Sequence, residues 1–478
     1  MNRPIRRVAF VAMLMFALLL ANGTYMTLFR TESLAAEPQN RRVRDAEFAQ
    51  DRGAILAAGK TEIATTSPSD DRFRYQRSYP AGSLYAPVTG FYSYDHGSTG
   101  VESTHNGQLA GTADALFVRR LIDLATNRAP QGASVQTTIV PAMQEAAARA
   151  LGDQKGAVVA LDPRTGAVLA LVTSPTYDPN DVASHRIEEA GAAYDRLAGA
   201  EDRPLANRAA REIYPPGSTF KLVTAAAALA DGKRPDSEVD SPDELTLPGT
   251  KTVLPNSTNC GGTRVTLTQA LEVSCNTAFA NLGLELGQDK LREQAQAFGF
   301  DQRHLADLNG VASQFPDDLD DAQLALSAIG QFDVAASPLQ MAMVTAGIAN
   351  DGVVMDPYLV SMVQAPDLKP LSTHEPTALS EAMTPENAAA LQQMMVETVA
   401  SGTGRNGAIA GVEVGGKTGT AQSDPSRKPF AWFTSFAPAD DPQVAVAVVV
   451  EDADIPRQDI AGGRVAAPIA RAVMEAGL

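Results

Sequence analysis

Cysteine, histidine and tryptophan are scarce in this sequence of 478 residues, which contains two, five and one of them, respectively. The histidines are scattered with no pair at ligand spacing, and the cysteines have no C-x-x-C partner. We therefore expect no metal site and no cofactor. Positive charge is also scarce, because the sequence has 39 basic and 56 acidic residues. The resulting net charge of −17 argues against a nucleic-acid partner.

The composition is that of a globular protein, with 44% hydrophobic and 20% charged residues, and the length suggests two or three domains. A long apolar run, Val8–Phe29, follows Arg3, Arg6 and Arg7. As a helix it would be about 33 Å long, enough to cross a bilayer. We favour an uncleaved anchor over a secretory signal, because the small-residue site near 33–35 lies far from this run. Either reading places the bulk of the chain outside the cytoplasm.

Two cysteines, Cys260 and Cys275, form an even count in a chain that is predicted to be exported. An oxidising compartment permits one disulfide between them, and two unpaired thiols are the alternative. We predict the bridge, which would steady the loop beside Asn276.

The sequence pattern changes near residue 152, where we place a domain boundary. The strands expected after it are 156–161, 167–172, 412–422, 431–436 and 443–451, and the helices are 322–349, 386–400 and 465–476. We expect a turn into a hairpin at 350–352 and a loop with four prolines over 366–385. Before the boundary we expect irregular β-structure and loops over 71–114, a helix over 113–125 and another over 141–151. This mixture predicts an α+β fold.

A candidate nucleophile lies at Ser218, directly after Pro215-Pro216-Gly217. The alanine- and leucine-rich run after Lys221 reads as a helix, and the prolines and glycine mark its start. Ser218 then lies in the first turn with Lys221 three residues on, which places both side chains on one face. A serine beside an amine that can accept its proton is an activated nucleophile.

Two further patterns follow in order. Ser274-Cys275-Asn276 lies between two helical stretches, and Lys417-Thr418-Gly419-Thr420 lies on an expected strand. The combination of S-x-x-K, S-x-N and K-T-G occurs in penicillin-binding proteins and class A β-lactamases, although Cys275 replaces the aspartate of the middle motif. Residues 411–418 also fit the nucleotide-binding P-loop pattern, but the glycine at 419 follows at once where a P-loop needs a helix.

With these motifs the chain resembles the class B penicillin-binding proteins, which are peptidoglycan DD-transpeptidases, and among them the short, anchored members of actinobacteria. The resemblance covers nearly the whole chain. It includes the pieces Arg52-Gly53-x-Ile55, Gly90–Ser93, Gly100–Glu102, Asp162–Gly166, Gly330-Gln331 and Pro338–Ala342.

The resemblance implies a transpeptidase domain of the penicillin-binding and β-lactamase type, with an antiparallel sheet flanked by helices. Residues 1–30 would form a cytoplasmic tail and membrane anchor, 31–151 an irregular β-rich pedestal of the dimerisation type, and 152–478 the transpeptidase domain. The implied partners are stem peptides ending in D-Ala-D-Ala, β-lactams, a membrane-embedded glycan polymerase that docks on the pedestal, and proteins of cell division or elongation.

The resemblance also implies roles for the site residues. Ser218 would be the nucleophile and Lys221 its proton acceptor, while Ser274 and Asn276 would line the other side of the cleft. Substrate would be held by Lys417, Thr418, Gly419 and Thr420. The backbone N–H groups of Ser218 and Thr420 would form the oxyanion hole.

Elementary chemistry fits these roles. Burial lowers the pKa of a lysine, and a second cation at Lys417 would lower that of Lys221 further. The hydroxyls of Thr418 and Thr420 suit a terminal carboxylate. Gly415, Gly416 and Gly419 would keep the strand clear for an approaching peptide.

Two other functions compete with transpeptidation. A β-lactamase or β-lactam sensor could share the fold, but the Glu-x-x-Leu-Asn loop of class A enzymes is absent between Asn276 and Lys417. A non-catalytic partner in cell-wall assembly is the second alternative, and the filled nucleophile and binding positions argue against it.

Overall fold

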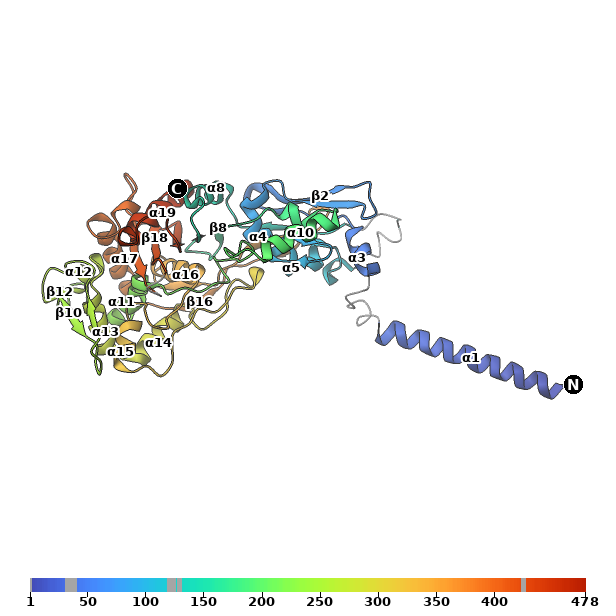
Figure 1. Cartoon of the computed structure of the whole chain (residues 1–478), viewed down its shortest axis with the longest axis horizontal. Helices are drawn as coiled ribbons and strands as arrows, with labels where there is room; N and C mark the ends of the chain where they lie inside the picture. Colours follow the sequence, from blue (N-terminus) through green and yellow to red (C-terminus); the bar gives the residue numbers. More distant parts are fainter. Residues whose placement is uncertain (1, 31–40, 118–125, 127–130, 423–426) are drawn as a thin grey trace.

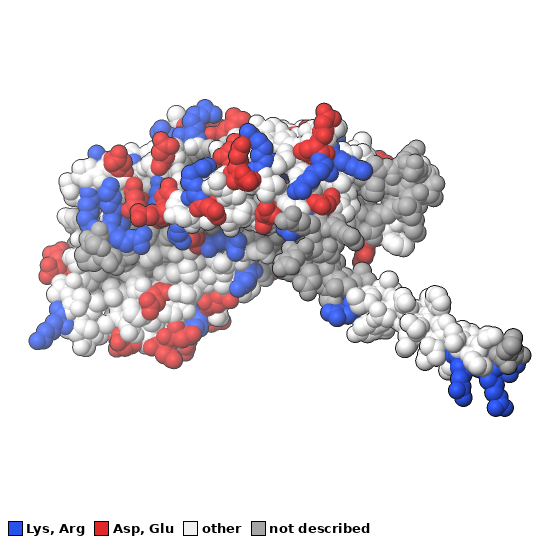
Figure 2. Space-filling view, turned by 45° about the vertical axis from the view of Figure 1, so that its right-hand side comes forward, with Lys and Arg blue, Asp and Glu red and all other residues white. Residues whose placement is uncertain are grey.

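The computed structural model describes residues 2–30, 41–117, 126, 131–422 and 427–478. At its N-terminus a single helix, α1 (Asn2–Phe29), projects from the rest of the chain (Figure 1). Its apolar window is entirely exposed and has a mean hydropathy of 1.9. Figure 2 shows basic side chains at the far end of this helix and an uncharged length behind them. The helix is consistent with a membrane anchor or a signal; the cleavage site considered near 33–35 lies outside the described residues.

The region after residue 152 is centred on a five-stranded antiparallel sheet in the order β17-β18-β19-β7-β8. Its strands are β7 (Gly156–Leu161), β8 (Val168–Ser174), β17 (Gly415–Ala421), β18 (Phe430–Ala437) and β19 (Val444–Val450). All five expected strands are confirmed. Their continuous apolar runs are explained by burial on both faces.

Helices cover the two faces of this sheet. α8 (Pro141–Leu151) and α19 (Ala467–Gly477) pack on one face, against Val158, Phe433 and Val446. α16 (Pro338–Ala349) packs on the other, in the larger core with Val159 and Trp432. Because successive strand residues point to opposite faces, one strand supplies both cores. The expected closing helix and the helix over 141–151 are confirmed.

The helix-rich middle of the chain lies beside the sheet (Figure 1). It comprises α11 (Lys221–Ala230), α12 (Leu267–Glu272), α13 (Asn276–Leu286), α14 (Gln288–Ala297), α15 (Asp321–Ser327) and α17 (Pro385–Ala400), with the short strands β9 (Glu238–Asp240), β10 (Glu244–Thr246), β11 (Val253–Pro255) and β12 (Arg264–Thr266). The prediction of one helix over 322–349 was wrong, because α15 and α16 are separate. Gly330 between them has a φ of +70°, and a Cβ there would lie 2.2 Å from the carbonyl oxygen of Gly217.

We had expected the proline-containing segment 366–385 to be a loop, and this prediction was wrong. It contains β15 (Pro370–Thr373) and β16 (Ala378–Glu381). β16 pairs with β13 (Val353–Met355), so the turn at 350–352 does not lead into a local hairpin. These pairings join strands far apart in sequence, which local patterns do not reveal.

The N-terminal region is built on a sheet that the later chain completes. β14 (Val360–Gln364) and β15 extend the order β15-β14-β6-β1-β2-β3, in which the other strands are β1 (Ile55–Leu56), β2 (Glu62–Pro68), β3 (Tyr75–Ser78) and β6 (Ser134–Thr137). Residues 71–114 hold more helix than predicted, in α4 (Ala86–Thr89), α5 (Gly100–Thr104) and α6 (Asn106–Leu109). The helix expected over 113–125 lies mostly outside the described residues.

A buried ion cluster fastens this region together. Glu102 accepts from Arg52 Nε and Arg77 Nε, both at 2.6 Å, and none of the three side chains is more than 4% exposed. Tyr79 donates its hydroxyl to the same carboxylate at 3.2 Å. The two arginines hold the pKa of Glu102 below its usual value despite burial, which would raise it. Sequence pieces fifty residues apart are therefore joined at one charge cluster.

Candidate active site

Ser218 lies in the short 3₁₀ turn η4 (Gly217–Thr219), which leads directly into α11. Gly217 N donates to Gly330 O at 2.9 Å, and Trp432 Nε1 donates to Pro215 O at 2.9 Å. Gly217 has a φ of +53°, and a Cβ there would lie 3.1 Å from the carbonyl oxygen of Thr420. Only glycine permits both this backbone conformation and this close approach to β17. The turn of Ser218 is thus held against the strand that carries the third motif.

Lys221 is fully buried one turn after Ser218. Its Nζ donates to Asn276 Oδ1 at 2.8 Å, to Ser274 O at 2.9 Å and to Ser274 Oγ at 3.3 Å. Among the described residues, no hydrogen bond joins the Ser218 hydroxyl to this amine. The first two motifs therefore meet through Lys221, which faces the Ser274–Asn276 turn.

Ser274 connects the second motif to the third. Lys417 Nζ donates to Ser274 Oγ at 2.9 Å and to Thr418 O at 3.0 Å. The Ser274 hydroxyl thus lies within hydrogen-bond reach of two amines. The residue has a φ of +60°, an unfavourable conformation for a side chain larger than glycine. Backbone strain of this kind persists where surrounding contacts hold it, and here both its carbonyl and its hydroxyl accept from Lys221.

Both amines are shifted toward their neutral forms. Burial lowers the pKa of Lys221 well below its usual value, and the nearby charge of Lys417 lowers it further. Burial alone lowers the pKa of Lys417 to about 7. These directions and causes confirm the expectation drawn from the sequence for Lys221. A neutral Lys221 can accept a proton at neutral pH.

A loop that the motif search missed orders the Ser274–Asn276 turn. Asn256 Oδ1 accepts from Asn276 N at 2.8 Å and from Thr277 N at 3.0 Å, so a side chain distant in sequence caps the start of α13. Thr258 Oγ1 donates to Val273 O at 2.6 Å. Asparagine is common in loops, and only the fold brings this one to a helix start, so the sequence carried no signal for it.

The predicted bridge between Cys260 and Cys275 is confirmed, with a Cα–Cα distance of 5.5 Å. Cys275 is fully buried and immediately precedes α13. The bridge therefore holds the far end of the 256–260 loop to the turn that contains Asn276, at the position where the motif has cysteine.

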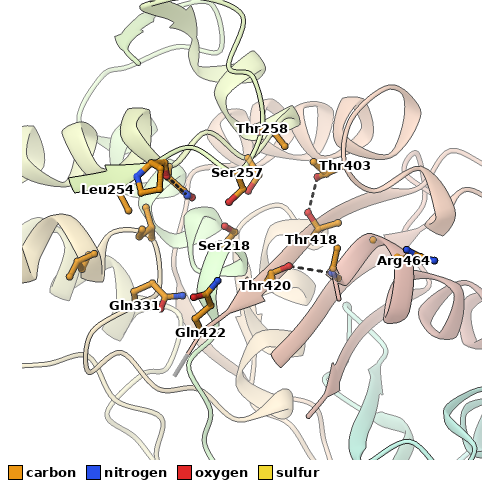
Figure 3. A pocket seen from close by; sticks show the side chains of 18 of the residues that line it. Ser218, Leu254, Ser257, Thr258, Gln331, Thr403, Thr418, Thr420, Gln422 and Arg464 are labelled. Carbon is orange, nitrogen blue, oxygen red and sulfur yellow. Dashed lines mark hydrogen bonds between the residues drawn. The ribbon is translucent and has the colours of Figure 1, made fainter. Parts of the chain in front are cut away.

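The third motif forms β17, an edge strand of the central sheet. Thr418 Oγ1 lies 2.7 Å from Thr403 Oγ1, and Thr420 Oγ1 accepts from Gly462 N at 3.4 Å. Figure 3 shows Thr418 and Thr420 on the same side of the strand, next to Ser218. Their two hydroxyls are placed where one ligand group could contact both.

The glycines of β17 make room for neighbours inside the protein. A Cβ at Gly415 would lie 2.3 Å, and one at Gly416 2.8 Å, from a phenylalanine ring of β18. A Cβ at Gly419 would lie 2.9 Å from Pro216 O. That the same glycines keep the edge of β17 clear for an approaching peptide stays a prediction.

Five of the predicted site residues line an open cleft of about 690 Å³: Ser218, Ser274, Asn276, Thr418 and Thr420. Ser218 lies between Leu254 and Gln331 on one side and Thr418 and Arg464 on the other (Figure 3). The lining residues are Ser218, Leu254, Pro255, Ser257, Thr258, Ser274, Asn276, Leu326, Ile329, Gln331, Phe332, Thr403, Asn406, Thr418, Thr420, Gln422, Ala461, Gly462, Gly463 and Arg464. Within the described part of the chain, no group of three or more His, Cys, Asp and Glu is arranged to hold a metal ion.

Two family models match the chain. The penicillin binding protein transpeptidase domain matches residues 156–475, and the penicillin binding protein A dimerisation domain matches residues 52–135.

Curated relatives and solved structures agree with these matches. Peptidoglycan D,D-transpeptidase PbpA of Mycolicibacterium smegmatis is 46% identical over 490 residues, covering 100% of this chain and 99% of the relative. Its counterpart in Mycobacterium tuberculosis H37Rv is 45% identical over 493 residues, with the same coverage. The structure of penicillin-binding protein A from M. tuberculosis as a ceftriaxone acyl-enzyme is similar with a TM-score of 0.87 at 44% identity, covering 91% of this chain and 100% of that one. The penicillin G acyl-enzyme of the same M. tuberculosis protein is similar with a TM-score of 0.85 at 44% identity, covering 89% of this chain and 99% of that one.

Proposed function

Because the chain belongs to the class B penicillin-binding proteins and is a peptidoglycan D,D-transpeptidase, we propose that Ser218 is its nucleophile and the residue that β-lactams acylate. The full-length similarity to D,D-transpeptidases favours this activity over a β-lactamase, a sensor or a non-catalytic partner. The observation that carries the assignment of residues is the Ser274 hydroxyl, which lies within 3.3 Å of Lys221 Nζ and 2.9 Å of Lys417 Nζ beside the Ser218 turn.

In the first half-reaction, neutral Lys221 accepts the proton of Ser218 Oγ as this oxygen attacks the carbonyl carbon of the penultimate D-alanine. The N–H groups of Ser218 and Thr420 stabilise the negative charge on the carbonyl oxygen. When the C–N bond breaks, the proton passes from Lys221 through the Ser274 hydroxyl to the departing amine of the terminal D-alanine. The product is an acyl ester on Ser218.

In the second half-reaction, the amine of a neighbouring stem peptide attacks this ester. The same groups act in reverse: the attacking amine loses its proton through Ser274, and Ser218 Oγ regains one from Lys221 as the ester bond breaks. A β-lactam enters at the first step, but its amine stays tethered to the acyl group after ring opening. The tether keeps the acceptor position filled, so the acyl-enzyme persists.

The carboxylate of the substrate lies, in this proposal, against the hydroxyls of Thr418 and Thr420. Lys417 adds positive charge behind them when it is protonated, and Gly419 keeps β17 close to the Ser218 turn. Asn276 Oδ1 accepts from Lys221, and its Nδ2, which donates to Pro255 O at 3.1 Å, has a second N–H for the substrate backbone. Each of the eight predicted site residues thus has a place in one reaction.

Mass spectrometry after treatment with penicillin G tests the nucleophile. We expect the adduct on the peptide that contains Ser218 and no adduct on Ser218→Ala. Ser257→Ala is the matched control, because Ser257 lines the same cleft but is on a different segment from Lys221. An adduct on Ser218→Ala, or its loss from Ser257→Ala, would remove Ser218 from the mechanism.

We further propose that α1 anchors the chain and that the catalytic region, 152–478, lies outside the cytoplasm. Arg3, Arg6 and Arg7 at one end of α1 support this orientation. Residues 31–151 would then form a pedestal that docks a membrane-embedded glycan polymerase and proteins of division or elongation, by analogy with the family. Co-purification with such a polymerase should be lost when 41–117 are replaced by the same region of a distant class B protein; retained co-purification would contradict the docking role.

A further inference from the structure

The cleft has two chemically different arms that meet at Ser218. On the side of Thr418 its lining is polar and ends at Arg464, the one ionisable side chain among the lining residues (Figure 3). Figure 3 places Leu254 and Gln331 on the other side of Ser218. The apolar lining residues, Leu254, Pro255, Leu326, Ile329 and Phe332, are near one or the other of these two in the sequence. We call these the polar arm and the apolar arm.

Phe332 is unusual within the apolar arm. Its side chain is 41% exposed, although a phenylalanine of a soluble domain is usually buried. Its φ is +62°, and among the described residues it is the only aromatic one with a positive φ. A bulky side chain in this conformation is a genuine outlier. Phe332 therefore lines the cleft in an unfavourable backbone conformation and without the benefit of full burial.

The segment before Phe332 fixes where the ring can lie. Gly330 O accepts from Gly217 N at 2.9 Å, which ties this loop to the turn of Ser218. Gln331 N donates to Leu326 O at 3.0 Å, which ties it to the end of α15. Phe332 follows both contacts directly, so its position is coupled to that of Ser218 and to the apolar arm.

We propose that Phe332 is a specificity-determining residue that contacts the apolar part of the acyl donor. The proposal rests on Ser218 as nucleophile and on the carboxylate lying in the polar arm. A donor with its carboxylate there and its carbonyl at Ser218 must extend into the apolar arm. In a stem peptide this part is the aliphatic side chain that precedes the two D-alanines, and in a penicillin it is the acylamino side chain.

Two penicillins that differ only in that side chain test the contact. Penicillin G carries an aryl acylamino group, and 6-aminopenicillanic acid carries none. Burial of about half of an aromatic side chain by the ligand corresponds to roughly tenfold in rate. For Phe332→Gly and Phe332→Ala we expect the second-order rate of acylation by penicillin G to fall about tenfold, and the rate for 6-aminopenicillanic acid to change less than twofold.

Leu368 provides a matched control. It also has a positive φ, +66°, and its side chain is 73% exposed, but it lies in the turn between β14 and β15 and does not line the cleft. Leu368→Gly and Leu368→Ala should leave both acylation rates unchanged. At each position the glycine variant should melt higher than the alanine variant, because only glycine relieves the backbone conformation.

Other outcomes overturn the proposal. An equal fall for both penicillins would mean that Phe332 acts on the Ser218 turn, and unchanged rates for both would mean that it contacts no ligand. A glycine variant that melts below its alanine counterpart would refute the strain at that position. Failure of the proposed nucleophile is distinguishable, because the wild-type protein would then carry neither penicillin on Ser218.

Discussion

Replacing Lys417 by methionine should make the protein more stable and nearly inactive. Lys417 is fully buried, and its amine contacts Ser274 Oγ and Thr418 O without an acidic partner in the hydrogen bonds recorded for it. Burial lowers its pKa from 10.5 to about 7. Methionine fills a similar volume without the amine, so the substitution removes the cost of burying this group while leaving the packing of β17 largely intact.

The sign of the effect follows from proton linkage. Between pH 7 and pH 10.5 the unfolded chain keeps the proton on Lys417 while the folded chain releases it, so folding is opposed by this group and stability rises with pH across that window. At pH 7.5 the opposing free energy is at most roughly 4 kcal/mol. Loss of the two hydrogen bonds offsets about 1–2 kcal/mol, which leaves a net gain of about 1–3 kcal/mol for Lys417→Met.

Thermal unfolding at several pH values is the measurement. At pH 7.5 we expect the melting temperature of Lys417→Met to exceed that of the wild type by about 2–5 °C, and the difference to shrink toward pH 10. Lys369→Met is the control, because Lys369 is 81% exposed and its replacement should leave the curve unchanged. The variant should also need a higher pH for whatever acylation remains, since the charge of Lys417 helps lower the pKa of Lys221.

A lower melting temperature for Lys417→Met at pH 7.5, or a difference that does not depend on pH, would refute this reasoning. The first result would mean that the hydrogen bonds of Lys417 outweigh its desolvation. The second would mean that its proton does not couple to folding.

Two further predictions concern residues outside the motifs. Asn256→Ala should remove the cap from α13 and let Asn276 move. Acylation by penicillin G should then slow at least fivefold, and the free energy of unfolding should fall by about 1–2 kcal/mol. An unchanged acylation rate would show that the disulfide alone orders the turn. Glu102→Ala should leave Arg52 and Arg77 buried without a counter-charge and lower the free energy of unfolding by about 3–5 kcal/mol. Its melting temperature should lie below that of the control Glu62→Ala, which changes an exposed residue of the same region. Equal melting of the two variants would show that water or a rearrangement satisfies the arginines.

The sequence indicated the parts of the fold that depend on local pattern. The five central strands were recognisable because valine- and alanine-rich runs such as Val444–Val450 are buried on both faces. Thr266-Leu267-Thr268-Gln269 also has the pattern of a capping box, and the Thr266 hydroxyl accepts from Gln269 N at 3.1 Å at the start of α12. The pairing of Cys260 with Cys275 was predicted from a count of two in a chain that is expected to be exported.

What the sequence did not indicate depends on approach between distant segments. The loop between α15 and α16 lies against the turn of Ser218, whose backbone occupies the space that a side chain at Gly330 would need. β13 pairs with β16 across an intervening hairpin. Asn256 and Phe332 belong to no motif, and their importance follows from the helix start and the cleft that the fold places beside them.

The same dependence on distant segments explains why the proposed mechanism uses all three motifs at once. Lys221 and Lys417 are both buried, both have lowered pKa values, and both donate to Ser274 Oγ. Two ammonium groups this close to one hydroxyl would repel each other in a medium that screens charge poorly, so the site favours at most one of them protonated. In the proposed mechanism, the proton released by Ser218 is held at one amine and passed on through Ser274, while the other amine and the threonines of β17 bind the carboxylate. One lysine could not perform both tasks, because the amine that accepts the proton must be neutral and the amine that binds the carboxylate must be charged.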